Sequence, residues 1–325
     1  MKNMPAEISA TLMIIVACWV ILLALDILIC AGIRLLWGIP FGKAFLWGLL
    51  ILLLPPALTA YGALIERNCF RIKEVEITFE DLPREFEGYK IVHISDIHGR
   101  SFSGREKHLH KAVDMINSLT PDMVAFTGDL ITLSPDELDG LVPVLGSLTA
   151  KDGVFSVLGN HDYSIYSDSS PQEHQKHVED LIAKEKALGW DLLLDENRII
   201  TRGKDSIAVI GVQNTSPSRH FPSKGDLKKA SKGTEGSFRI VLSHDPMHWE
   251  SEILGQDYPL TLSGHTHAMQ FSILGWSPSS LMFDQYRGLY ESNGQAIYVN
   301  PGLGETIFPA RIGVRPEITL ITLKR

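Results

Sequence analysis

The sequence predicts an α/β domain that follows two transmembrane helices. Two long apolar spans lie within the first 65 residues and contain a single charged residue between them. Beyond the spans, short apolar runs rich in β-branched residues alternate with helical patterns, which is typical of an α/β sheet. About 250 residues remain there, a length that suits one large domain.

The two apolar spans, residues 11–33 and 44–65, are each long enough to cross a membrane. At about 1.5 Å of rise per residue each reaches about 33 Å, against a hydrocarbon core of roughly 30 Å. A cleaved signal peptide is the alternative. Its apolar region has roughly 7 to 15 residues, fewer than the first span, and here a second span follows. The sequence therefore predicts a membrane-spanning helix hairpin.

Two features interrupt the apolar spans. Pro55 and Pro56 predict a kink in the second helix, because proline donates no backbone hydrogen bond. Asp26 lies inside the first span and either has a polar function, or simply pairs with a neighbour or faces the kink. Two helices form no evident pathway for an ion or a substrate, so we favour the second, structural interpretation.

The orientation of the hairpin depends on the basic residues near its ends. With two spans, the amino terminus and everything after residue 67 lie on the same side of the membrane. Four basic residues lie on that side and two in the turn between the spans: Lys2, Arg67, Arg71 and Lys73 against Arg34 and Lys43. This small excess favours a cytoplasmic carboxyl-terminal domain in the cytoplasmic membrane.

The charge and the cysteines exclude some classes of partner and site. After residue 75 there are 24 basic and 34 acidic residues, a net charge of −10, so we expect no nucleic-acid partner. The three cysteines, Cys18, Cys30 and Cys69, lie in or beside the spans. The predicted domain therefore has no thiol for a disulfide or a thiolate metal site.

Six apolar runs of the domain each end in a polar turn that carries aspartate, asparagine or histidine. These runs read as buried strands, and the patterns at 106–118 and 172–188 between them read as helices. Ligands of an α/β sheet collect at the carboxyl ends of its strands, so the turns are expected to converge. The runs are KIVHISDIH, DMVAFTGDL, GVFSVLGNHD, FRIVLSHDP, LTLSGHTH and AIYVNPGLG.

The polar turns offer seven candidate metal ligands: Asp96, His98, Asp129, Asn160, His244, His265 and His267. In extended backbone, residues two apart point to the same side, so the D-x-H and H-x-H spacings each present two ligands together. Imidazole nitrogens, carboxylates and one amide oxygen suit Mn, Fe or Zn better than Ca or Mg. Seven ligands are too many for one tetrahedral ion and suit two ions that share a carboxylate.

These motifs resemble those of the calcineurin-like metallophosphoesterases, whose signature runs D-x-H, G-D, G-N-H-[DE], H and G-H-x-H. All five blocks occur in order, and the resemblance covers residues from about 90 to 325. It implies a four-layer α-β-β-α sandwich of two mixed sheets. The closing segment, residues 298–325, is similar to a bacterial membrane-associated branch related to UDP-2,3-diacylglucosamine pyrophosphatases.

The resemblance also implies roles for the site residues. It assigns one of two divalent ions, with Mn favoured, to Asp96, His98, Asp129 and His267, and the other to Asp129, Asn160, His244 and His265. Asp129 would bridge the two. His161 would face the substrate as a proton donor or a stabiliser of phosphoryl charge, and Asp162 would orient its ring.

Structural explanations compete with each of these assignments. A single polar residue at a strand end more often caps a turn than binds a metal, and only the joint pattern makes that explanation improbable. His161 has a structural alternative as a supporting residue behind the ligands. Tyr163, Arg100 and Tyr286 lie near motifs and have no assignable role.

Two further segments each allow more than one interpretation. The basic stretch at 219–232 either binds a diphosphate or anionic headgroups, or is a solvated surface loop, which we favour. The apolar stretch at 268–290 either lines the site for acyl chains, dips into a bilayer, or packs in the core.

The sequence thus predicts a membrane anchor at 1–75 and a catalytic domain at 76–325. The expected activity is metal-dependent hydrolysis of a phosphoester or phosphoanhydride, on a lipid-linked substrate such as UDP-2,3-diacylglucosamine, with the bilayer as partner. One alternative is a phosphodiesterase for soluble diesters or nucleotides. Another is a catalytically silent, metal-binding membrane scaffold.

Overall fold

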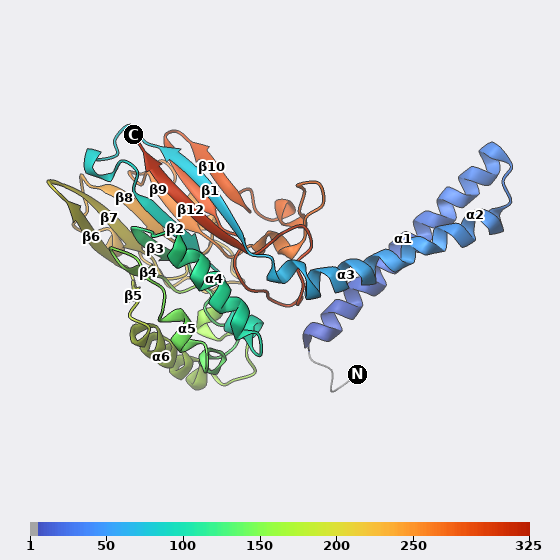
Figure 1. Ribbon diagram of the computed structural model, residues 1–325, viewed down its shortest axis with the longest axis horizontal. Coiled ribbons are helices and arrows are strands. Elements are labelled where there is room, and N and C mark those ends of the chain that lie inside the picture. Colours follow the sequence, from blue (N-terminus) through green and yellow to red (C-terminus); the bar gives the residue numbers. More distant parts are fainter. Residues whose placement is uncertain (1–5) are drawn as a thin grey trace.

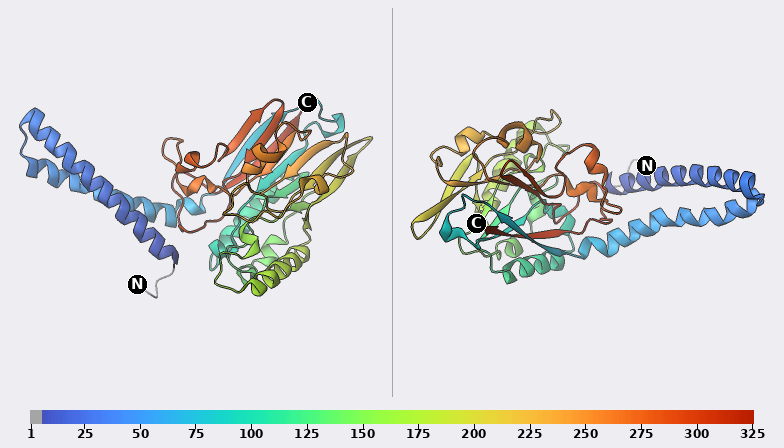
Figure 2. Two further views of the ribbon diagram at one scale, coloured as in Figure 1. Left: turned by 180° about the vertical axis from the view of Figure 1, so that it is seen from behind. Right: turned by 90° about the horizontal axis from the view of Figure 1, so that it is seen from above.

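The computed structural model describes residues 6–325 and consists of a helix hairpin joined to a two-sheet domain (Figure 1). Both arms of the hairpin run away from the domain side by side (Figure 2). Two stretches, Thr11–Trp37 and Phe41–Asn68, are long and apolar enough to cross a membrane, which confirms the predicted pair of helices. The hairpin is built from α1 (Ala6–Trp37), α2 (Phe41–Gly48), the 3-10 turn η1 (Leu49–Leu53) and α3 (Leu54–Leu64).

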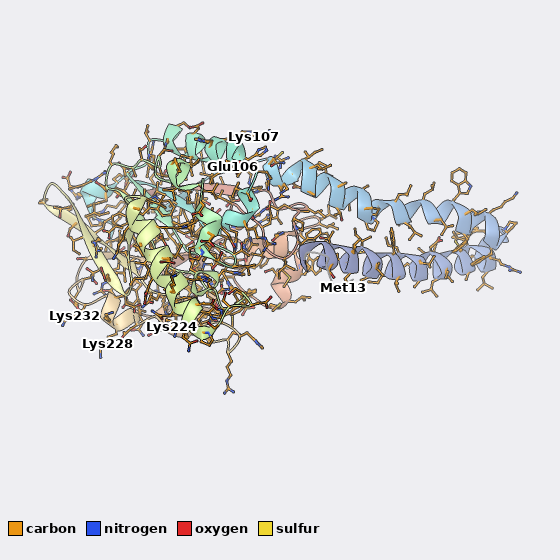
Figure 3. All side chains as sticks on the ribbon, turned by 90° about the horizontal axis from the view of Figure 1, so that it is seen from below. Met13, Glu106, Lys107, Lys224, Lys228 and Lys232 are labelled. Atoms are coloured by element: carbon orange, nitrogen blue, oxygen red, sulfur yellow. The ribbon has the colours of Figure 1, made fainter. Side chains whose placement is uncertain are left out.

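Large apolar side chains of the hairpin point away from its own helices. Met13 in α1 is exposed, and Figure 3 shows it projecting from the helix. Leu28 of α1 and Leu53 of η1 are also exposed. An apolar exterior is stable in lipid and costly in water. Lys2, which contributes to the orientation prediction, lies outside the described residues.

The hydrogen bonding of the second arm changes at the predicted kink. The helix tightens to the 3-10 form just before Pro55 and Pro56. Pro56 cannot donate to the carbonyl of Leu52, four residues earlier. The indole Nε1 of Trp19 in α1 donates to that carbonyl instead, at 2.6 Å. The two arms thus share a hydrogen bond at a carbonyl that would otherwise be unpaired in lipid.

Asp26 is buried between the two arms of the hairpin. The Cys30 thiol donates to its Oδ1 at 3.3 Å. A Cβ atom added to Gly48 in the other arm would lie 1.7 Å from the same oxygen, so only glycine leaves room for the carboxyl group. Asp26 therefore pairs with a neighbour, the interpretation favoured from the sequence.

The domain contains two six-stranded mixed sheets. The first has the order β1-β12-β2-β3-β4-β5, and only the β12–β2 pair is antiparallel. Its strands are β1 (Arg71–Thr78), β2 (Lys90–Ile94), β3 (Met123–Phe126), β4 (Val154–Ser156), β5 (Asp191–Leu192) and β12 (Glu317–Lys324). The second has the order β10-β11-β9-β8-β7-β6, with antiparallel pairs at its two edges. Its strands are β6 (Glu196–Arg202), β7 (Asp205–Gly211), β8 (Phe238–Leu242), β9 (Leu260–Ser263), β10 (Gly288–Ser292) and β11 (Gln295–Val299).

Helices cover the outer faces of both sheets, so the predicted layered α/β fold is confirmed. The first sheet carries α4 (Glu106–Ser118), α5 (Val142–Leu145) and α6 (Pro171–Ala187), and the first and last of these match the predicted helical patterns. The second sheet has only a thin cover, α7 (Leu227–Ala230) and the π-helical turn η7 (Trp249–Ile253). A central core of residues such as Ile91, Val209 and Leu262 lies between the sheets.

Short 3-10 turns complete the chain. They are η2 (Glu66–Asn68), η3 (Arg84–Phe86), η4 (Gly99–Phe102), η5 (Pro135–Leu138), η6 (His161–Tyr163), η8 (His267–Gln270) and η9 (Pro278–Leu281). Three of them, η4, η6 and η8, begin at or next to a predicted site residue. The polar turns of the sequence are therefore tight local turns at strand ends.

The hairpin is fastened to the domain at the end of α3. Arg67 makes a two-point ion pair with Glu305, with Nε–Oε1 at 3.0 Å and Nη2–Oε2 at 2.8 Å. Glu66 accepts a hydrogen bond from the Gly313 backbone at 3.0 Å. The expected boundary after residue 75 falls inside β1, which pairs with β12 along its whole length. The domain thus begins at β1, five residues before that boundary.

Candidate metal centre

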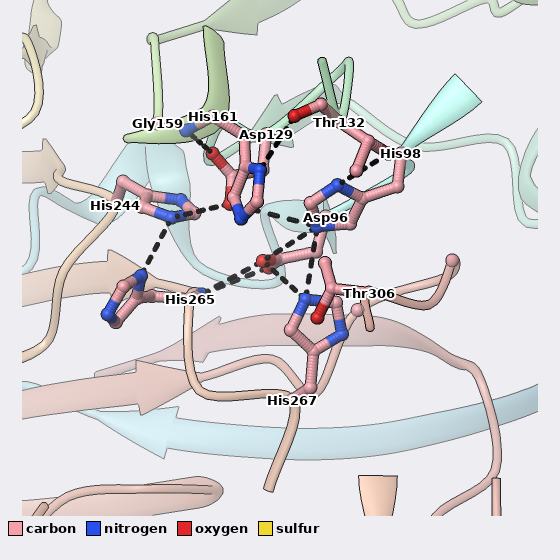
Figure 4. A network of polar contacts seen from close by, with 12 residues as sticks. Asp96, His98, Asp129, Thr132, Gly159, His161, His244, His265, His267 and Thr306 are labelled. Atoms are coloured by element: carbon pink, nitrogen blue, oxygen red, sulfur yellow. Dashed lines mark hydrogen bonds and ion pairs between the residues drawn. The ribbon is translucent and has the colours of Figure 1, made fainter. Parts of the chain in front are cut away.

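The predicted ligands all follow the carboxyl ends of strands, and the fold brings these ends together where the two sheets meet. Figure 4 shows the aspartates and histidines pointing toward one another. Six of the seven are buried, and His265 is partly exposed. The first sheet supplies Asp96 and His98 after β2, Asp129 after β3 and Asn160 after β4; the second supplies His244 after β8 and His265 and His267 after β9.

Asp96, His98 and His267 form one group of candidate ligands. Their donor atoms all lie within 4.8 Å of one another. The Nε2 atom of His267 lies 3.1 Å from Asp96 Oδ1 and 3.1 Å from His98 Nε2. These are three of the four residues that the resemblance assigns to the first ion.

Asp129, His244 and His265 form a second group, within the same 4.8 Å limit. Asn160 joins it, because its Oδ1 lies 3.0 Å from His244 Nε2 and 2.7 Å from His265 Nδ1. The Asp129 carboxylate faces both groups. Its Oδ2 lies 3.1 Å from His244 Nε2 and 3.7 Å from His98 Nε2. Asp129 is therefore the only candidate bridge among the described ligand groups.

The chemistry of these contacts fits two divalent ions. Ligands at about 2.0 to 2.2 Å from one ion lie about 2.8 to 3.6 Å apart at octahedral or tetrahedral angles. The His98–His267 and His244–His265 nitrogen pairs, at 3.1 and 3.2 Å, fall in that range. Two imidazole lone pairs repel each other at such distances unless a proton or a cation lies between them. The donor set of carboxylate, amide and imidazole is one that Mn, Fe and Zn accept.

The electrostatics of the site also favour a cation. Burial opposes ionisation of Asp96 and Asp129, yet the neighbouring imidazoles lower the pKa of both carboxyl groups. Burial lowers the pKa of His98, so its ring is neutral, as a metal ligand must be. Burial also acts to lower the pKa of His244, but Asp129 beside it raises that pKa to about 10. The buried carboxylates thus attract positive charge into the site.

Five candidate ligands have left-handed backbone, where the sequence predicts extended backbone. Side chains two apart were expected to point together because the backbone is extended. The φ angles are instead 50° at Asp96, 47° at His98, 59° at Asp129, 72° at His265 and 49° at His267. Such angles are uncommon outside glycine and concentrate at functional sites. Tight turns, and not strand alternation, aim these side chains.

Glycine at position 159 leaves room for the Asp129 carboxylate. A Cβ atom added to Gly159 would lie 2.3 Å from Asp129 Oδ1 and 2.6 Å from the Asp129 backbone nitrogen. The turn after β4 therefore approaches Asp129 more closely than any residue with a side chain allows. This contact explains why glycine precedes Asn160.

The predicted orientation of His161 by Asp162 is wrong. The His161 ring places Nδ1 at 2.8 Å from the backbone carbonyl oxygen of Thr132. A carbonyl oxygen only accepts, so Nδ1 carries the proton and Nε2 is the nitrogen left for the cleft. The sequence could not point to Thr132, because every residue has a backbone carbonyl whatever its side chain.

Asp162 instead stabilises the turn that carries Asp129, the candidate bridge. Its carboxylate accepts backbone N–H bonds from Asp129, Leu130 and Gly159, each at 2.8 Å. Asp162 is fully buried and comes from the turn after β4, whereas Asp129 follows β3. Asp162 is therefore a positioning residue for Asp129.

Three residues of the site were missed from the sequence. The Tyr166 hydroxyl accepts from Asn160 Nδ2 at 2.9 Å, which turns the amide oxygen toward the second ligand group. Phe221 packs edge-on against His265, with ring centroids 4.5 Å apart. The fully buried Arg311 lies 3.4 Å from His267 Nδ1 and donates to the Pro301 carbonyl at 2.9 Å. None of the three belongs to a motif.

A cleft of about 350 Å³ opens over the two ligand groups. Its polar floor includes Asp129, Asn160, His161, His265 and His267. Its walls combine one cationic residue with four largely apolar ones: Arg100, Leu133, Tyr166, Phe221 and Ile307. A cleft of this kind suits a phosphate group that carries an apolar substituent.

The basic stretch at 219–232 contributes little charge to the cleft. Phe221 lines the cleft, but Lys224, Lys228 and Lys232 are exposed on the surface. Figure 3 shows Lys228 and Lys232 at the end of the domain away from the hairpin. This placement agrees with the solvated surface loop that the sequence favours.

Comparisons with known proteins agree with the geometry. The family model for calcineurin-like phosphoesterases matches residues 89–269. A Danio rerio "Transmembrane protein with metallophosphoesterase domain" is 34% identical over 289 residues, which cover 85% of this chain and 62% of the relative. The "Uncharacterized metallophosphoesterase YkuE" of Bacillus subtilis is 30% identical over 309 residues, 87% of this chain and 97% of the relative. This chain thus spans less than two thirds of the zebrafish relative and nearly all of the bacterial one.

Proposed function

The chain belongs to the calcineurin-like phosphoesterases, enzymes that hydrolyse phosphoester bonds, and we propose that it is a membrane-anchored enzyme that uses two divalent ions. One observation carries the proposal most directly. Two groups of three ligands lie on either side of one carboxylate, that of Asp129. If these buried, closely spaced imidazoles had only a structural role, the lone pairs of neighbouring rings would face and repel each other.

The ligands divide between the two ions as the geometry groups them. Asp96, His98 and His267 would hold the first ion, and Asn160, His244 and His265 the second, with Asp129 shared. When bound, the ions supply Lewis acidity toward the phosphoryl oxygens, activation of a water and neutralisation of the incoming anion. This explains how a domain with a net charge of −10 binds a phosphate.

His161 is proposed to act on the substrate itself. Because the Thr132 carbonyl holds the proton on Nδ1, His161 meets the cleft through Nε2. A protonated Nε2 stabilises charge on the phosphoryl group and delivers a proton to the leaving oxygen. The Asp129 carboxylate also accepts the His161 backbone N–H at 2.8 Å, so the bridging ligand and this histidine are held together.

The substrate is proposed to be a lipid-linked phosphoester or phosphoanhydride. The membrane association supports this, because the hairpin confines the cleft to the vicinity of a bilayer. The apolar walls of the cleft, Leu133, Phe221 and Ile307, support it further. UDP-2,3-diacylglucosamine is the specific candidate, and soluble phosphodiesters or nucleotides are the alternative substrates.

A substrate comparison tests the proposal. The full chain, purified in detergent with Mn²⁺, is assayed with UDP-2,3-diacylglucosamine, a phospholipid and an aryl phosphodiester. Preference for a lipid-linked substrate supports the proposal, and preference for the aryl diester supports the soluble alternative. No hydrolysis of any of them by metal-loaded protein contradicts the enzymatic function.

Metal content tests the division of ligands independently of the substrate. His265→Ala is expected to lose one ion per chain and retain the other, and His267→Ala to lose the other one. Mn, Fe and Zn are quantified by mass spectrometry after dialysis, and Mn is the proposed resident metal. Retention of two ions in either variant contradicts the assignment.

The proposed location is the cytoplasmic membrane, with the domain on the cytoplasmic side. Its support is the small excess of basic residues at the domain end of the hairpin, of which Arg67 pairs with Glu305 and Arg71 with Glu317. Accessibility of Lys204, in the exposed turn between β6 and β7, to a membrane-impermeant amine reagent in intact cells tests the side. A Lys204→Arg variant identifies the modified peptide, and modification without cell disruption contradicts the proposed side.

A further inference from the structure

The segment of residues 268–283, here called the apolar loop, exposes much of its apolar surface. It contains no charged residue. Ala268 and Phe283 are buried at its two ends, but six large apolar side chains between them are exposed: Met269, Ile273, Leu274, Trp276, Leu281 and Met282. Packing in the domain core, one of the interpretations left open by the sequence, is therefore wrong for these six. A water-soluble surface rarely gathers so many apolar side chains.

The tip of the apolar loop is a two-residue turn with a leucine in an unfavourable position. Ile273 and Trp276 exchange backbone hydrogen bonds of 2.9 and 3.0 Å. Between them Leu274 and Gly275 both have positive φ, 50° and 87°. Asparagine or glycine normally occupies the first position of such a turn. Leu274 is instead fully exposed, at 103% of its reference area, so neither backbone preference nor packing in the domain accounts for it.

The apolar loop is connected to the end of the membrane hairpin through one intervening segment, residues 310–313. The loop contributes two hydrogen bonds to this segment, Ser272 N–H to Ile312 O and Gln270 Nε2 to Ala310 O, both at 2.8 Å. On its other side the segment meets α3 and η2. A Cβ added to Gly62 would lie 2.6 Å from Arg311 O, and Gly313 donates to Glu66.

The figures agree with this connection. In Figure 1 the η8–η9 region, drawn in orange, projects from the side of the domain that faces the hairpin. Both views of Figure 2 place the same region at the end of the domain from which the hairpin extends. The exposed apolar loop and the membrane helices therefore lie at one end of the domain.

We propose that the apolar loop inserts into the bilayer interface beside the hairpin, as a second membrane contact. The hairpin already brings this end of the domain to the membrane, and the loop offers that surface apolar side chains without charge. Trp276 is a residue enriched at membrane interfaces. The insertion is shallow, with the side chains reaching about 5 to 10 Å into the headgroup and acyl boundary, because irregular backbone is excluded from the hydrocarbon core.

The insertion has a consequence for the cleft that rests on the proposed function. Phe283, the last residue of the apolar loop, packs edge-on against His265 with centroids 5.6 Å apart. Ile307, which lines the cleft, is also exposed and precedes Phe308, whose carbonyl bonds Gln270 of the loop. The membrane contact thus lies directly beside the metal site, so a lipid-linked phosphate reaches the ions without leaving the interface.

Depth-dependent quenching tests the insertion without reference to activity. The full chain, with Cys18, Cys30 and Cys69 replaced by serine, carries one new cysteine labelled with the NBD fluorophore and is reconstituted in nanodiscs containing nitroxide-labelled lipid. Leu274→Cys and, independently, Leu281→Cys are the test sites. Leu28→Cys in α1 is the positive control and Lys204→Cys, in the turn between β6 and β7, the negative control.

The insertion predicts at least about twofold more quenching at Leu274 and Leu281 than at Lys204, strongest with nitroxides near the headgroups. Quenching at both sites no greater than at Lys204 overturns the proposal. Quenching that is unchanged by lipid but altered by a second, unlabelled copy of the chain also overturns it, since the surface then serves self-association.

An activity measurement separates this proposal from the proposed function. The double variant Leu274→Ser with Leu281→Ser is expected to hydrolyse a soluble aryl phosphodiester at the wild-type rate. Its rate on a phosphorylated lipid embedded in the nanodisc is expected to fall by about tenfold. Equal rates of the wild type and the double variant on the embedded lipid contradict the role of the loop. If the wild type hydrolyses none of the substrates, the proposed function is contradicted, and the quenching result alone decides whether the loop inserts.

Discussion

Leucine side chains are exposed in the hairpin and buried in the domain. In the hairpin Leu28, Leu36 and Leu53 have 68%, 70% and 65% of their area exposed. In the domain Leu242 and Leu262 are fully buried in the core between the sheets. This difference is the one expected for a hairpin surrounded by lipid and a domain surrounded by water, because exposed apolar side chains are stable in lipid and costly in water. The apolar loop belongs to the domain, yet it exposes large apolar side chains as the hairpin does.

Both regions also bury carboxyl groups, but in different surroundings. Asp26 lies between the hairpin helices with Cys30 as its only described partner, and one of its oxygens has none. The domain gathers Asp96 and Asp129 among four histidines at the junction of its sheets. A single carboxyl group is thus isolated in the hairpin, whereas the domain gathers two with histidines, and among the described residues that gathered set has the chemistry of a metal site.

The largest effect is expected from Asp129→Ala, which removes the carboxylate shared by both ligand groups. Phosphoesterase activity is expected to fall by about 1,000-fold or more, equivalent to about 4 kcal/mol of transition-state stabilisation. Both ions are expected to be lost, because each keeps only its other three ligands. Activity assays and metal analysis of the purified full chain provide the measurement.

The matched control for this variant is Asp257→Ala. Asp257 is exposed and pairs with Arg239 at 3.3 Å, a surface contact of small worth. Both variants are expected to stay in the membrane fraction, since neither touches the hairpin. Activity of Asp129→Ala within tenfold of the control contradicts the bridging assignment.

The next effect separates chemistry from metal binding. His161→Asn is expected to lower the turnover rate by about 100- to 10,000-fold, the usual range for a general acid or base. The two ions are expected to remain, because His161 belongs to neither group of candidate ligands and its Nδ1 is bonded to the Thr132 carbonyl. His110→Asn, an exposed position of α4, is the control. Loss of an ion in His161→Asn would make this histidine a structural or ligating residue.

A third substitution breaks the junction between the two regions. Gly62→Val is expected to destabilise the docking of the hairpin by about 1 to 3 kcal/mol, because a Cβ at Gly62 would lie 2.6 Å from the Arg311 carbonyl oxygen. Gly32→Val is the matched control, since a Cβ at Gly32 meets nothing within 4 Å. Limited proteolysis near residues 66–70 is expected to accelerate only for Gly62→Val. Equal cleavage of both variants contradicts a tightly docked junction.

A fourth substitution concerns a buried carboxyl outside the metal centre. Glu185 in α6 is fully buried, bonds Ser156 Oγ at 2.7 Å and leaves Oε1 without a described partner. Burial, reinforced by Asp162, raises the pKa of Glu185 to about 8. The folded state thus holds the proton more tightly than the unfolded state, so stability is lost as pH rises from about 4.5 to about 8.

Glu185→Gln removes this dependence because glutamine does not ionise. Its melting temperature is expected to exceed that of the wild type by about 2 to 4 °C at pH 9 and by less at pH 5. Thermal unfolding of the full chain in detergent at the two pH values provides the measurement. A difference that is the same at both pH values would mean that Glu185 keeps its charge state throughout.

The smallest effect is expected from Leu274→Asn. Asparagine tolerates the left-handed backbone that Leu274 adopts at φ 50°, so the variant is expected to be more stable in detergent by up to about 1 kcal/mol. Ile199→Asn, an exposed strand position of β6, is the control and is expected to lose stability. A less stable Leu274→Asn would show that the leucine packs on the domain.

The metal site was largely predictable because its residues are local motifs at strand ends. Aspartate and histidine at D-x-H and H-x-H spacing predict ligands wherever a buried strand precedes them, and the seven predicted ligands do converge. The reason given for the spacing was wrong, since left-handed turns aim these side chains. Asp162 was misassigned for a related reason: adjacency to His161 along the chain does not bring their side chains together.

The sequence by itself determined the two apolar helices, the alternation of strands and helices, and the identity of the candidate ligands, because each depends on residues close together in the chain. Tertiary structure alone decided that Thr132 holds the His161 ring and that Asp162 supports Asp129. It alone decided that the apolar loop is exposed beside the hairpin. Burial and hydrogen bonding belong to surfaces that meet in space, and no local pattern of residues specifies which surfaces meet.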